Sequence, residues 1–384
     1  MKKLVGVLLL AAFLTYIGCH IVFINIPLSE TYPAYSPVLS DNDIIVSKYA
    51  KKEAQLLAFL ERHMLGNGGE ILTNTNPSGE GKETLSESVG ILMNYAVLRD
   101  RKDIFDRELE FLENRMMVNK RSHRFVRWKT AKNAVSCNAA VDDLRIVRAL
   151  LDAYDTWGDR KYYNTAGFIQ AGIYESQVKD GGLCEFFDWE AGLVRDSVPL
   201  CYLDFYTMDR MSPFNEEWLK VADRGLCIAK YGRVDQPSPF FYKYYDYKKM
   251  TYTADEELER KKGVCVTYTL ITAIHLLEVN EDTGFLTEWL ADEMSDKRLY
   301  GWYDPYSLKP AQNIESTAVY ALASIYAGKT GEKALSMKLL DRMLEFMVTD
   351  KKSQYFGGFG NVKTGDFYSF DNLTALWALA LADR

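Results

Sequence analysis

Glu87 is the acidic residue whose local pattern best fits acid–base chemistry. The segment from Glu83 to Tyr95 opens a predicted helix, with Ser86 placed to cap it and Glu87 in its first turn. A carboxyl group held there could donate a proton if a nearby carboxylate or an apolar wall raised its pKa. The simpler alternative is a capping carboxylate with no chemistry, because acidic residues are common in first turns.

Other common catalytic groups are poorly represented in the chain. The four histidines show no spacing typical of a zinc motif, and no G-x-S-x-G elbow marks a serine nucleophile. Five cysteines follow the N-terminal segment, an odd number without the spacing of a disulfide framework. The net charge of −7 comes from acidic and basic residues mixed along the chain, which argues against a nucleic-acid partner. We therefore expect neither a metal nor a cofactor.

Apolar residues recur at three- and four-residue steps along most of the chain, which predicts one helix after another. The predicted helices run over 43–65, 84–98, 102–117, 138–156, 160–176, 197–209, 214–230, 264–279, 284–295, 313–328, 331–348 and 370–382. Short turns join many of them, which favours helical hairpins. Six hairpins in a ring give an all-α (α/α)6 toroid. A helical solenoid is the alternative, but no fixed repeat period is visible.

Longer loops rich in polar and aromatic residues separate the predicted hairpins, at 66–83, 118–137, 178–196, 231–262, 296–312 and 349–369. They fall at every second connection, so in a toroid they would gather on one face and wall a cleft there. Long loops inside a compact domain usually carry function. We therefore expect the binding site on that face.

The N-terminal segment is predicted to be a membrane anchor. Lys2 and Lys3 precede a run from Leu4 to Leu28 that contains no Asp, Glu, Lys or Arg and is long enough to span a bilayer. The residues up to Cys19 also resemble a lipoprotein processing site. We therefore expect residues 1–30 to hold the protein outside the cytoplasm, through an uncleaved helix or a lipidated Cys19. A short linker, 31–42, and a single domain, 43–384, would follow.

Several segments resemble, in chain order, signature segments of glycoside hydrolase family 8. The likeness is strongest over about 83–220, although Ser88 stands where the family's first motif has glycine. The matching segments are Ser86-Glu87 with Gly90, Phe125-Val126-Arg127-Trp128, Asn138 to Ile146, Leu150 to Asp159, and Val198 to Leu203. The resemblance implies the toroid fold and a polysaccharide substrate. It is nearest to membrane-anchored members that accompany exopolysaccharide synthases, which makes a synthase complex a possible partner.

The resemblance also implies roles for particular residues. Glu87 matches the family's general acid, and Asp142 or Asp143 matches an aspartate at the sugar subsite beside the scissile bond, with the choice between the two left open. Tyr202 matches a tyrosine near the cleft. Flat aromatic rings pack well on the apolar faces of sugars, and on that ground Trp128, Tyr244 and Trp302 are predicted to contact substrate.

The second catalytic carboxylate is harder to identify from the sequence. Family members that lack the string Tyr-Asp-Ala-x-Arg, as this chain does, take the base from a long loop before a late helix. In the corresponding stretch Asp246, among tyrosines, is the first candidate and Asp255 is the second.

These features predict an inverting, endo-acting hydrolase of a β-linked exopolysaccharide, with Glu87 as acid. Inversion needs the two carboxyl groups roughly 6.5–9.5 Å apart, so that a water molecule fits between the base and the sugar. The principal alternative is a glycan-binding accessory protein of exopolysaccharide synthesis that has lost the base. A polysaccharide lyase on the same fold is a third possibility.

Overall fold

The computed structural model describes residues 43–76, 81–120, 123–130, 135–235, 238–253, 263–296 and 298–382. The predicted anchor (1–30), the predicted linker (31–42) and Asp255 lie outside these residues. Within the described ranges, no helix has both the length and the apolar character needed to cross a bilayer. This finding does not bear on the predicted anchor.

The described part of the chain is mostly helical, as the sequence predicts. Its α-helices are α2 (Asp43–His63), α3 (Ser86–Leu98), α4 (Lys102–Phe111), α5 (Ala140–Trp157), α6 (Arg160–Gln177), α7 (Phe205–Arg210), α8 (Glu217–Tyr231), α10 (Val266–Glu278), α11 (Gly284–Ser295), α12 (Thr317–Lys329), α13 (Lys333–Leu344) and α14 (Ser369–Ala382). A π-helix, η1 (Leu112–Met116), extends α4, and a 3-10 turn, η2 (Leu200–Tyr202), precedes α7.

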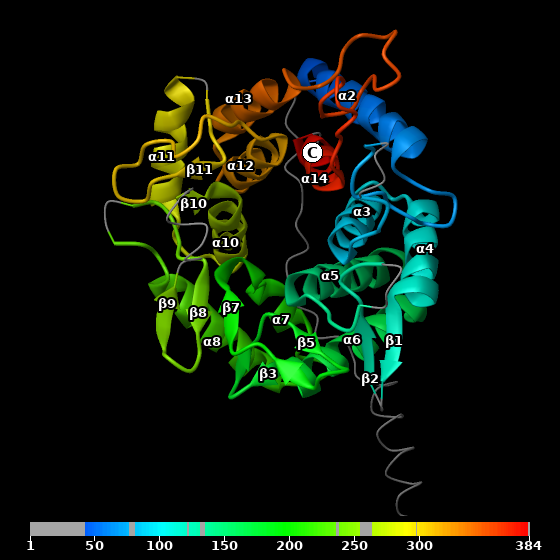
Figure 1. Cartoon of the computed structure of the whole chain (residues 1–384), viewed down its shortest axis with the longest axis vertical. Coiled ribbons are helices and arrows are strands. Elements are labelled where there is room, and N and C mark those ends of the chain that lie inside the picture. The colour runs from blue at the N-terminus through cyan, green and yellow to red at the C-terminus, as the bar shows by residue number, and fades with distance from the viewer. Residues whose placement is uncertain are drawn as a thin grey trace, which may run out of the picture.

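The helices are arranged around a common centre (Figure 1). Helices α3, α5, α7, α10, α12 and α14 lie inside, and α2, α4, α6, α8, α11 and α13 lie outside them. Neighbouring inner helices pack directly, as α3 does with α5 and α14, and α12 does with α10 and α14. Inner helix α12 is buried without interruption from Ala318 to Ala327, because other helices cover it on all sides.

Tight turns join an inner helix to the outer helix that follows it, as α5 is joined to α6. Helix α5 ends at Gly158, whose φ of 70° lies in the left-handed region that glycine adopts without strain. The next residue, Asp159, caps α6 by accepting a hydrogen bond from the Lys161 backbone N–H (3.0 Å). This sequence of a glycine stop and an aspartate start reverses the chain between two packed helices.

The long loops between the helices also contain short strands. The strands are β1 (Met117–Lys120), β2 (His123–Val126), β3 (Val178–Lys179), β4 (Gly182–Leu183), β5 (Phe187–Asp188), β6 (Leu193–Val194), β7 (Ser197–Pro199), β8 (Tyr244–Asp246), β9 (Thr251–Thr253), β10 (Val264–Cys265) and β11 (Trp302–Tyr303). All pair antiparallel, mostly as hairpins, and the largest sheet within the described residues is β7-β8-β9.

One predicted helix is largely replaced by other structure. The helix expected over 197–209 begins only at Phe205, because Ser197–Pro199 pairs with Tyr244–Asp246 as a strand. Proline at position 199 cannot donate the backbone hydrogen bond that a helix interior needs, and it is tolerated at the end of a short strand.

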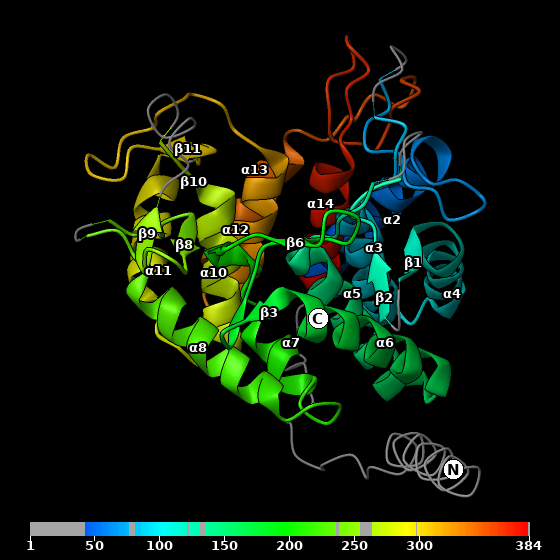
Figure 2. The same ribbon diagram turned by 60° about the horizontal axis from the view of Figure 1, so that its bottom comes forward.

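The inner helices begin at one common face of the molecule. Helices α3, α5, α10, α12 and α14 each follow one of the long loops, and Figure 2 shows these loops gathered above the helix ends. Backbone N–H groups of the first turns are therefore directed to the loop-bearing face, where they favour negative charge.

Replacing Gly158 with alanine should destabilise the fold by about 1 kcal/mol, because a β-carbon disfavours the left-handed backbone. Gly328→Ala is the matched control. Gly328 is helical, and an added β-carbon would meet Ser336 Oγ at an ordinary 3.7 Å, so this change should be neutral or slightly stabilising. Denaturant unfolding measures both, and equal losses of stability would contradict the turn's role.

Candidate active site

Three acidic side chains come together at the loop-bearing ends of inner helices. Glu87, Asp142 and Asp371 lie in the first turns of α3, α5 and α14 respectively. Asp142 and Asp371 both act electrostatically on the Glu87 carboxyl. Because α3 packs against both α5 and α14, the three first turns meet although their residues are far apart in sequence.

Ser86 ties the start of α3 to the start of α5. Its hydroxyl donates to Asp142 Oδ2 (2.7 Å) and also lies 3.1 Å from the carbonyl oxygen of Trp128. The backbone N–H of Glu87 donates to the same aspartate. The prediction that Ser86 caps α3 is therefore wrong. The cap position is Leu85, and Ser86 is the first helical residue, with its hydroxyl turned to a neighbouring helix.

Arg145 holds the other side of the Asp142 carboxylate. Its guanidinium donates to Asp142 Oδ1 at 3.1 Å, and its side chain passes close to the backbone of α3 at Gly90. A β-carbon at Gly90 would lie 3.2 Å from Arg145 Cγ and Cδ, which is tighter than usual. The glycine four residues after Ser86 therefore gives the arginine room to reach the aspartate.

The Glu87 carboxyl holds its proton into the neutral range. Removal of this group from solvent is the main cause that raises its pKa to about 7, and the negative charges of Asp142 and Asp371 raise it further. Arg145 acts in the opposite direction and lowers the pKa. The sequence predicts this environment, in which an apolar surrounding and a neighbouring carboxylate keep a general acid protonated.

The structure separates the two adjacent aspartates of α5. Asp142 lies beside Glu87, whereas Asp143 accepts a hydrogen bond from Asn138 Nδ2 (2.7 Å). Asn138 in turn donates to Gln177 Oε1, and its own Oδ1 accepts from the Phe187 backbone. Asp143 thus belongs to a buried polar network that holds the loop after α6. Of the two candidates left open by the sequence, Asp142 is the one at the site.

Asp371 was not predicted from the sequence. Its carboxylate is partly buried and accepts hydrogen bonds from the Ala318 backbone (2.9 Å) and the Ser316 hydroxyl (3.3 Å), and its pKa is raised because the group is partly removed from solvent. A second contact, between the Ser88 and Ser369 hydroxyls (2.9 Å), joins α3 to α14 nearby. The available signal was its position in the first turn of a helix that follows a long loop, which it shares with Glu87.

The structure does not bring Asp246 beside Glu87. Asp246 ends β8, and Figure 1 places β8 across the ring from α3. Its carboxylate accepts hydrogen bonds from the backbone N–H groups of Lys248 and Lys249, both at 2.9 Å, which lowers its pKa and forms the β8–β9 turn. A catalytic role for Asp246 stays a prediction, and so does that of Asp255.

The predicted aromatic contacts divide into two groups. Trp128 directly precedes the segment that pairs with Leu85 at the start of α3, and Tyr202 lies close enough to Asp142 for its pKa to be raised by that charge, after the larger effect of burial. Tyr244 and Trp302 lie on β8 and β11, beside β7 and the start of α10. The structure therefore places Trp128 beside the start of α3 and Tyr202 near Asp142, and all four residues are partly exposed.

The described residues contain no group of three or more His, Cys, Asp and Glu side chains arranged to hold a metal ion. The polar groups around Glu87 instead form a carboxylate cluster with one neighbouring guanidinium, from Arg145. Such a cluster can hold one proton on Glu87, and it can accept hydrogen bonds from hydroxyl groups through the other two carboxylates.

Comparison with known proteins supports the fold and suggests a chemistry. No family model matches the sequence. YdaJ of Bacillus subtilis (strain 168), provisionally described as a lipoprotein, is 27% identical over 325 residues, which cover 83% of this chain and 84% of that protein. A structure from Clostridium perfringens, described as a novel alpha-amylase, has 26% identity and a TM-score of 0.79, covering 86% of this chain and 97% of that one.

The solved structures similar to this chain also include family 8 glycosyl hydrolases. One is the endoglucanase Cel10 from Klebsiella pneumoniae, with 17% identity and a TM-score of 0.58, covering 85% of this chain and 99% of that one. A cold-adapted family 8 xylanase is another. The chain therefore has the fold of glycoside hydrolase family 8, and the resemblance predicted from the sequence is confirmed at this level.

Removing the Asp142 charge should make the Glu87 carboxyl a stronger acid. We expect Asp142→Asn to lower the Glu87 pKa from about 7 towards its ordinary value, because a raising charge is lost. The matched control is Asp143→Asn, which makes the same substitution one residue away, on a side chain that belongs to a separate network. NMR titration of side-chain-labelled glutamate measures the pKa directly, and equal shifts in both variants would contradict the assignment.

Glu87 should also make the protein less stable as pH rises. Between its ordinary pKa of 4.5 and the folded value of about 7, the folded chain binds a proton that the unfolded chain has lost, so stability falls across this window. Glu87→Gln should remove the loss, and its free energy of unfolding should exceed the wild type's by about 1–3 kcal/mol at pH 8 but little at pH 4.

Denaturant unfolding at the two pH values tests this expectation. Glu217→Gln is the control, because it makes the same change in the first turn of an outer helix, on an exposed side chain paired with Lys220. A pH-independent effect of Glu87→Gln would show that the Glu87 pKa is the same in the folded and the unfolded chain, which would contradict the raised value.

Proposed function

We propose that this protein is an inverting, endo-acting glycoside hydrolase that cleaves a polysaccharide outside the cytoplasmic membrane. The observation that carries the proposal is the Glu87 carboxyl, which keeps its proton near neutral pH beside two further carboxyl groups at the loop-bearing end of the inner helices. We also propose that the ring of helices is an (α/α)6 toroid and that residues 43–384 form a single domain.

Glu87 would act as the general acid. Glycosidic cleavage needs a proton on the leaving oxygen as the bond to the sugar breaks, and a carboxyl group with a pKa of about 7 still carries that proton at neutral pH. The helix N-terminus would favour the ionised form after transfer, because first-turn N–H groups stabilise negative charge. The acid is thus neutral before the reaction and tolerated as an anion after it.

Asp371 is the strongest candidate for the base among the described residues, because it is the carboxylate beside Glu87 that is not bonded to Arg145. It would accept a proton from the attacking water, and inversion would follow if about 6.5–9.5 Å separates it from Glu87. Asp246 and Asp255 remain alternative proposals for this role. Asp142, fixed by Ser86 and Arg145, would accept hydrogen bonds from the sugar bound next to the cleaved linkage.

The substrate is proposed to be a β-linked exopolysaccharide, with Trp128 and Tyr202 against the sugar rings nearest the acid and Tyr244 and Trp302 further away. Similarity to an endoglucanase and a xylanase supports a β-linkage, whereas similarity to a described alpha-amylase supports an α-linked glucan as the competing substrate. Similarity to a provisional lipoprotein supports an anchored protein outside the cytoplasm. A complex with an exopolysaccharide synthase is part of the proposal.

The alternative function is a non-catalytic glycan-binding accessory protein. It is favoured by the absence of a Tyr-Asp-Ala-x-Arg string, which carries the base in many family 8 proteins. Such a protein would retain the aromatic residues and Asp142 for binding, and the protonated Glu87 would serve as a hydrogen-bond donor to the glycan.

Reducing-end release from a panel of α-linked and β-linked polysaccharides tests the proposal. Wild-type protein should cleave at least one of them, and Glu87→Gln should lower kcat by about 10²–10⁴-fold while glycan binding persists. Asp371→Asn, Asp246→Asn and Asp255→Asn in the same assay identify the base, and Glu217→Gln is the control that should retain activity. Anomeric NMR of the first product then reports inversion.

The two alternatives give different outcomes in these experiments. Binding without any release of reducing ends, equal in wild type and Glu87→Gln, would establish the accessory protein and exclude the hydrolase. A product that absorbs in the ultraviolet would indicate β-elimination by a lyase.

A further inference from the structure

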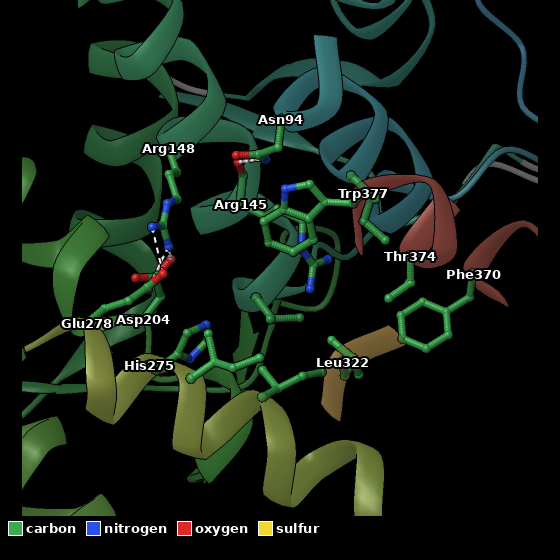
Figure 3. A pocket seen from close by; sticks show the side chains of 14 residues that line it. Asn94, Arg145, Arg148, Asp204, His275, Glu278, Leu322, Phe370, Thr374 and Trp377 are labelled. Atoms are coloured by element: carbon green, nitrogen blue, oxygen red, sulfur yellow. Dashed lines mark hydrogen bonds and ion pairs between the residues drawn. The ribbon is translucent and has the colours of Figure 1, made fainter. Parts of the chain in front are cut away.

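A cavity lies at the centre of the ring, between the inner helices, and Figure 3 shows the side chains that line it. Its volume is about 50 Å³, enough for roughly three to five water molecules. Five of the inner helices and the segment before α7 contribute to its wall. The lining residues are Ile91, Asn94, Val141, Arg145, Arg148, Asp204, Ile271, Ile274, His275, Glu278, Leu322, Phe370, Thr374 and Trp377. We call this cavity the axial chamber.

The axial chamber is separate from the carboxylates around Glu87. Arg145 stands between them, since its guanidinium donates to Asp142 on one side and lines the chamber on the other. Glu87 and Asp142 are not among the lining residues. A ligand in the chamber would therefore not occupy the place of the scissile bond.

Two buried polar atoms of the chamber wall have no hydrogen-bond partner. They are Nδ1 of His275, whose residue is 9% exposed, and Oγ1 of Thr374, whose residue is 1% exposed. Both residues belong to the wall of the chamber, His275 on α10 and Thr374 on α14 (Figure 3). A buried hydroxyl or imidazole nitrogen without a partner is costly, so these atoms indicate a hydrogen-bonding ligand.

The charges in the chamber wall cancel one another. Arg148 donates two hydrogen bonds to Glu278 (2.7 and 2.8 Å) and lies 3.7 Å from Asp204, while Arg145 is held by Asp142. Each guanidinium is therefore matched by a carboxylate. Burial lowers the pKa of His275, which favours its neutral form. An ion entering the chamber would meet no unpaired opposite charge, and it would lose its hydration.

The remaining wall is apolar and partly aromatic. Ile91, Ile271 and Leu322 form aliphatic surfaces, and Phe370 and the Trp377 indole add rings from α14 (Figure 3). A mostly apolar wall with a few fixed polar atoms is typical of sites for small neutral molecules. Hydroxyl groups would satisfy His275 and Thr374, and C–H groups would pack on the rings, which is the pattern of a polyol.

We propose that the axial chamber binds one small neutral polyol, of about the bulk of glycerol or erythritol, with hydroxyl groups on His275 Nδ1 and Thr374 Oγ1. This site is independent of hydrolysis at Glu87. Arg145 lines the chamber and also donates a hydrogen bond to Asp142, so a polyol bound in the chamber would lie next to Arg145.

Ligand-observed NMR titration of the full chain with glycerol, erythritol and the glycerate anion tests the proposal, in buffer free of glycerol and of detergents with sugar headgroups. Glycerol or erythritol should bind saturably, and glycerate should not. Thr374→Val should weaken binding by about tenfold, because one hydrogen bond to the ligand is lost. Leu322→Trp, which fills the chamber, should abolish binding. Glu87→Gln should bind as the wild type does.

Thr272→Val is the matched control for Thr374→Val. Thr272 is an equally buried threonine, but its hydroxyl donates to the Tyr268 carbonyl oxygen (2.8 Å) and it does not line the chamber. Without ligand, Thr374→Val should leave the Tm unchanged or raise it, because an unpaired hydroxyl is removed, whereas Thr272→Val should lower it. Polyol binding should be unaffected by Thr272→Val.

Three outcomes would overturn the proposal. They are the absence of saturable binding, binding that survives both Thr374→Val and Leu322→Trp, and a crystal structure in glycerol whose chamber contains water alone. Failure of the hydrolase proposal is recognised separately, because it would leave polysaccharides uncleaved while the chamber still binds the polyol.

Discussion

The main physical constraint on the site is that three carboxyl groups, those of Glu87, Asp142 and Asp371, lie near one another with little solvent around them. Like charges at such a site cannot all ionise readily at neutral pH, so one carboxyl group retains a proton. Burial also raises the pKa of Asp142 and of Asp371, but hydrogen bonds to their ionised forms act in the opposite direction, from Ser86 and Arg145 to Asp142 and from the Ala318 backbone to Asp371. Glu87 is the member whose proton is kept, with a pKa of about 7.

The packing of α3 against α5 and α14 brings these carboxyl groups together. The carboxyl groups meet because α3 packs between α5 and α14, and small residues allow the close approach. Gly90 leaves space for the Arg145 side chain, and the Ser88 and Ser369 hydroxyls bond across the α3–α14 contact. The family-like pattern of Ser86, Glu87 and Gly90 therefore combines three functions in five residues: a link to α5, an acid, and a gap for the arginine. Glu87 lowers the free energy of unfolding once it ionises, because the folded protein surrounds its charge with little solvent.

Around the axial chamber, the buried charges on these helices are paired with one another. Arg148, Asp204 and Glu278 pair with one another, and Lys329 adds a contact to Glu278 at 2.9 Å. Pairing with Arg148 and Lys329 lowers the pKa of Glu278, whereas removal from solvent, with a smaller effect of the neighbouring carboxylates, raises that of Glu87. One end of the axis is thus suited to proton transfer, and the other is electrically balanced around a small chamber. Arg145 is the residue common to both.

The sequence by itself determined the helices, the long loops that precede the inner ones, and the place of Glu87 in a first turn. These features are local, because hydrophobic periodicity and turn residues are read within one or two helical turns. The tertiary structure alone decided that Asp142, and not Asp143, lies beside Glu87. Neighbouring residues on a helix point about 100° apart, so the packing angle of α5 selects between them. It also decided that Ser86 bonds another helix, that Asp246 forms a turn, and that Asp371 joins the site from the far end of the chain. Contacts of this kind depend on which helices pack together, and no local pattern records that choice.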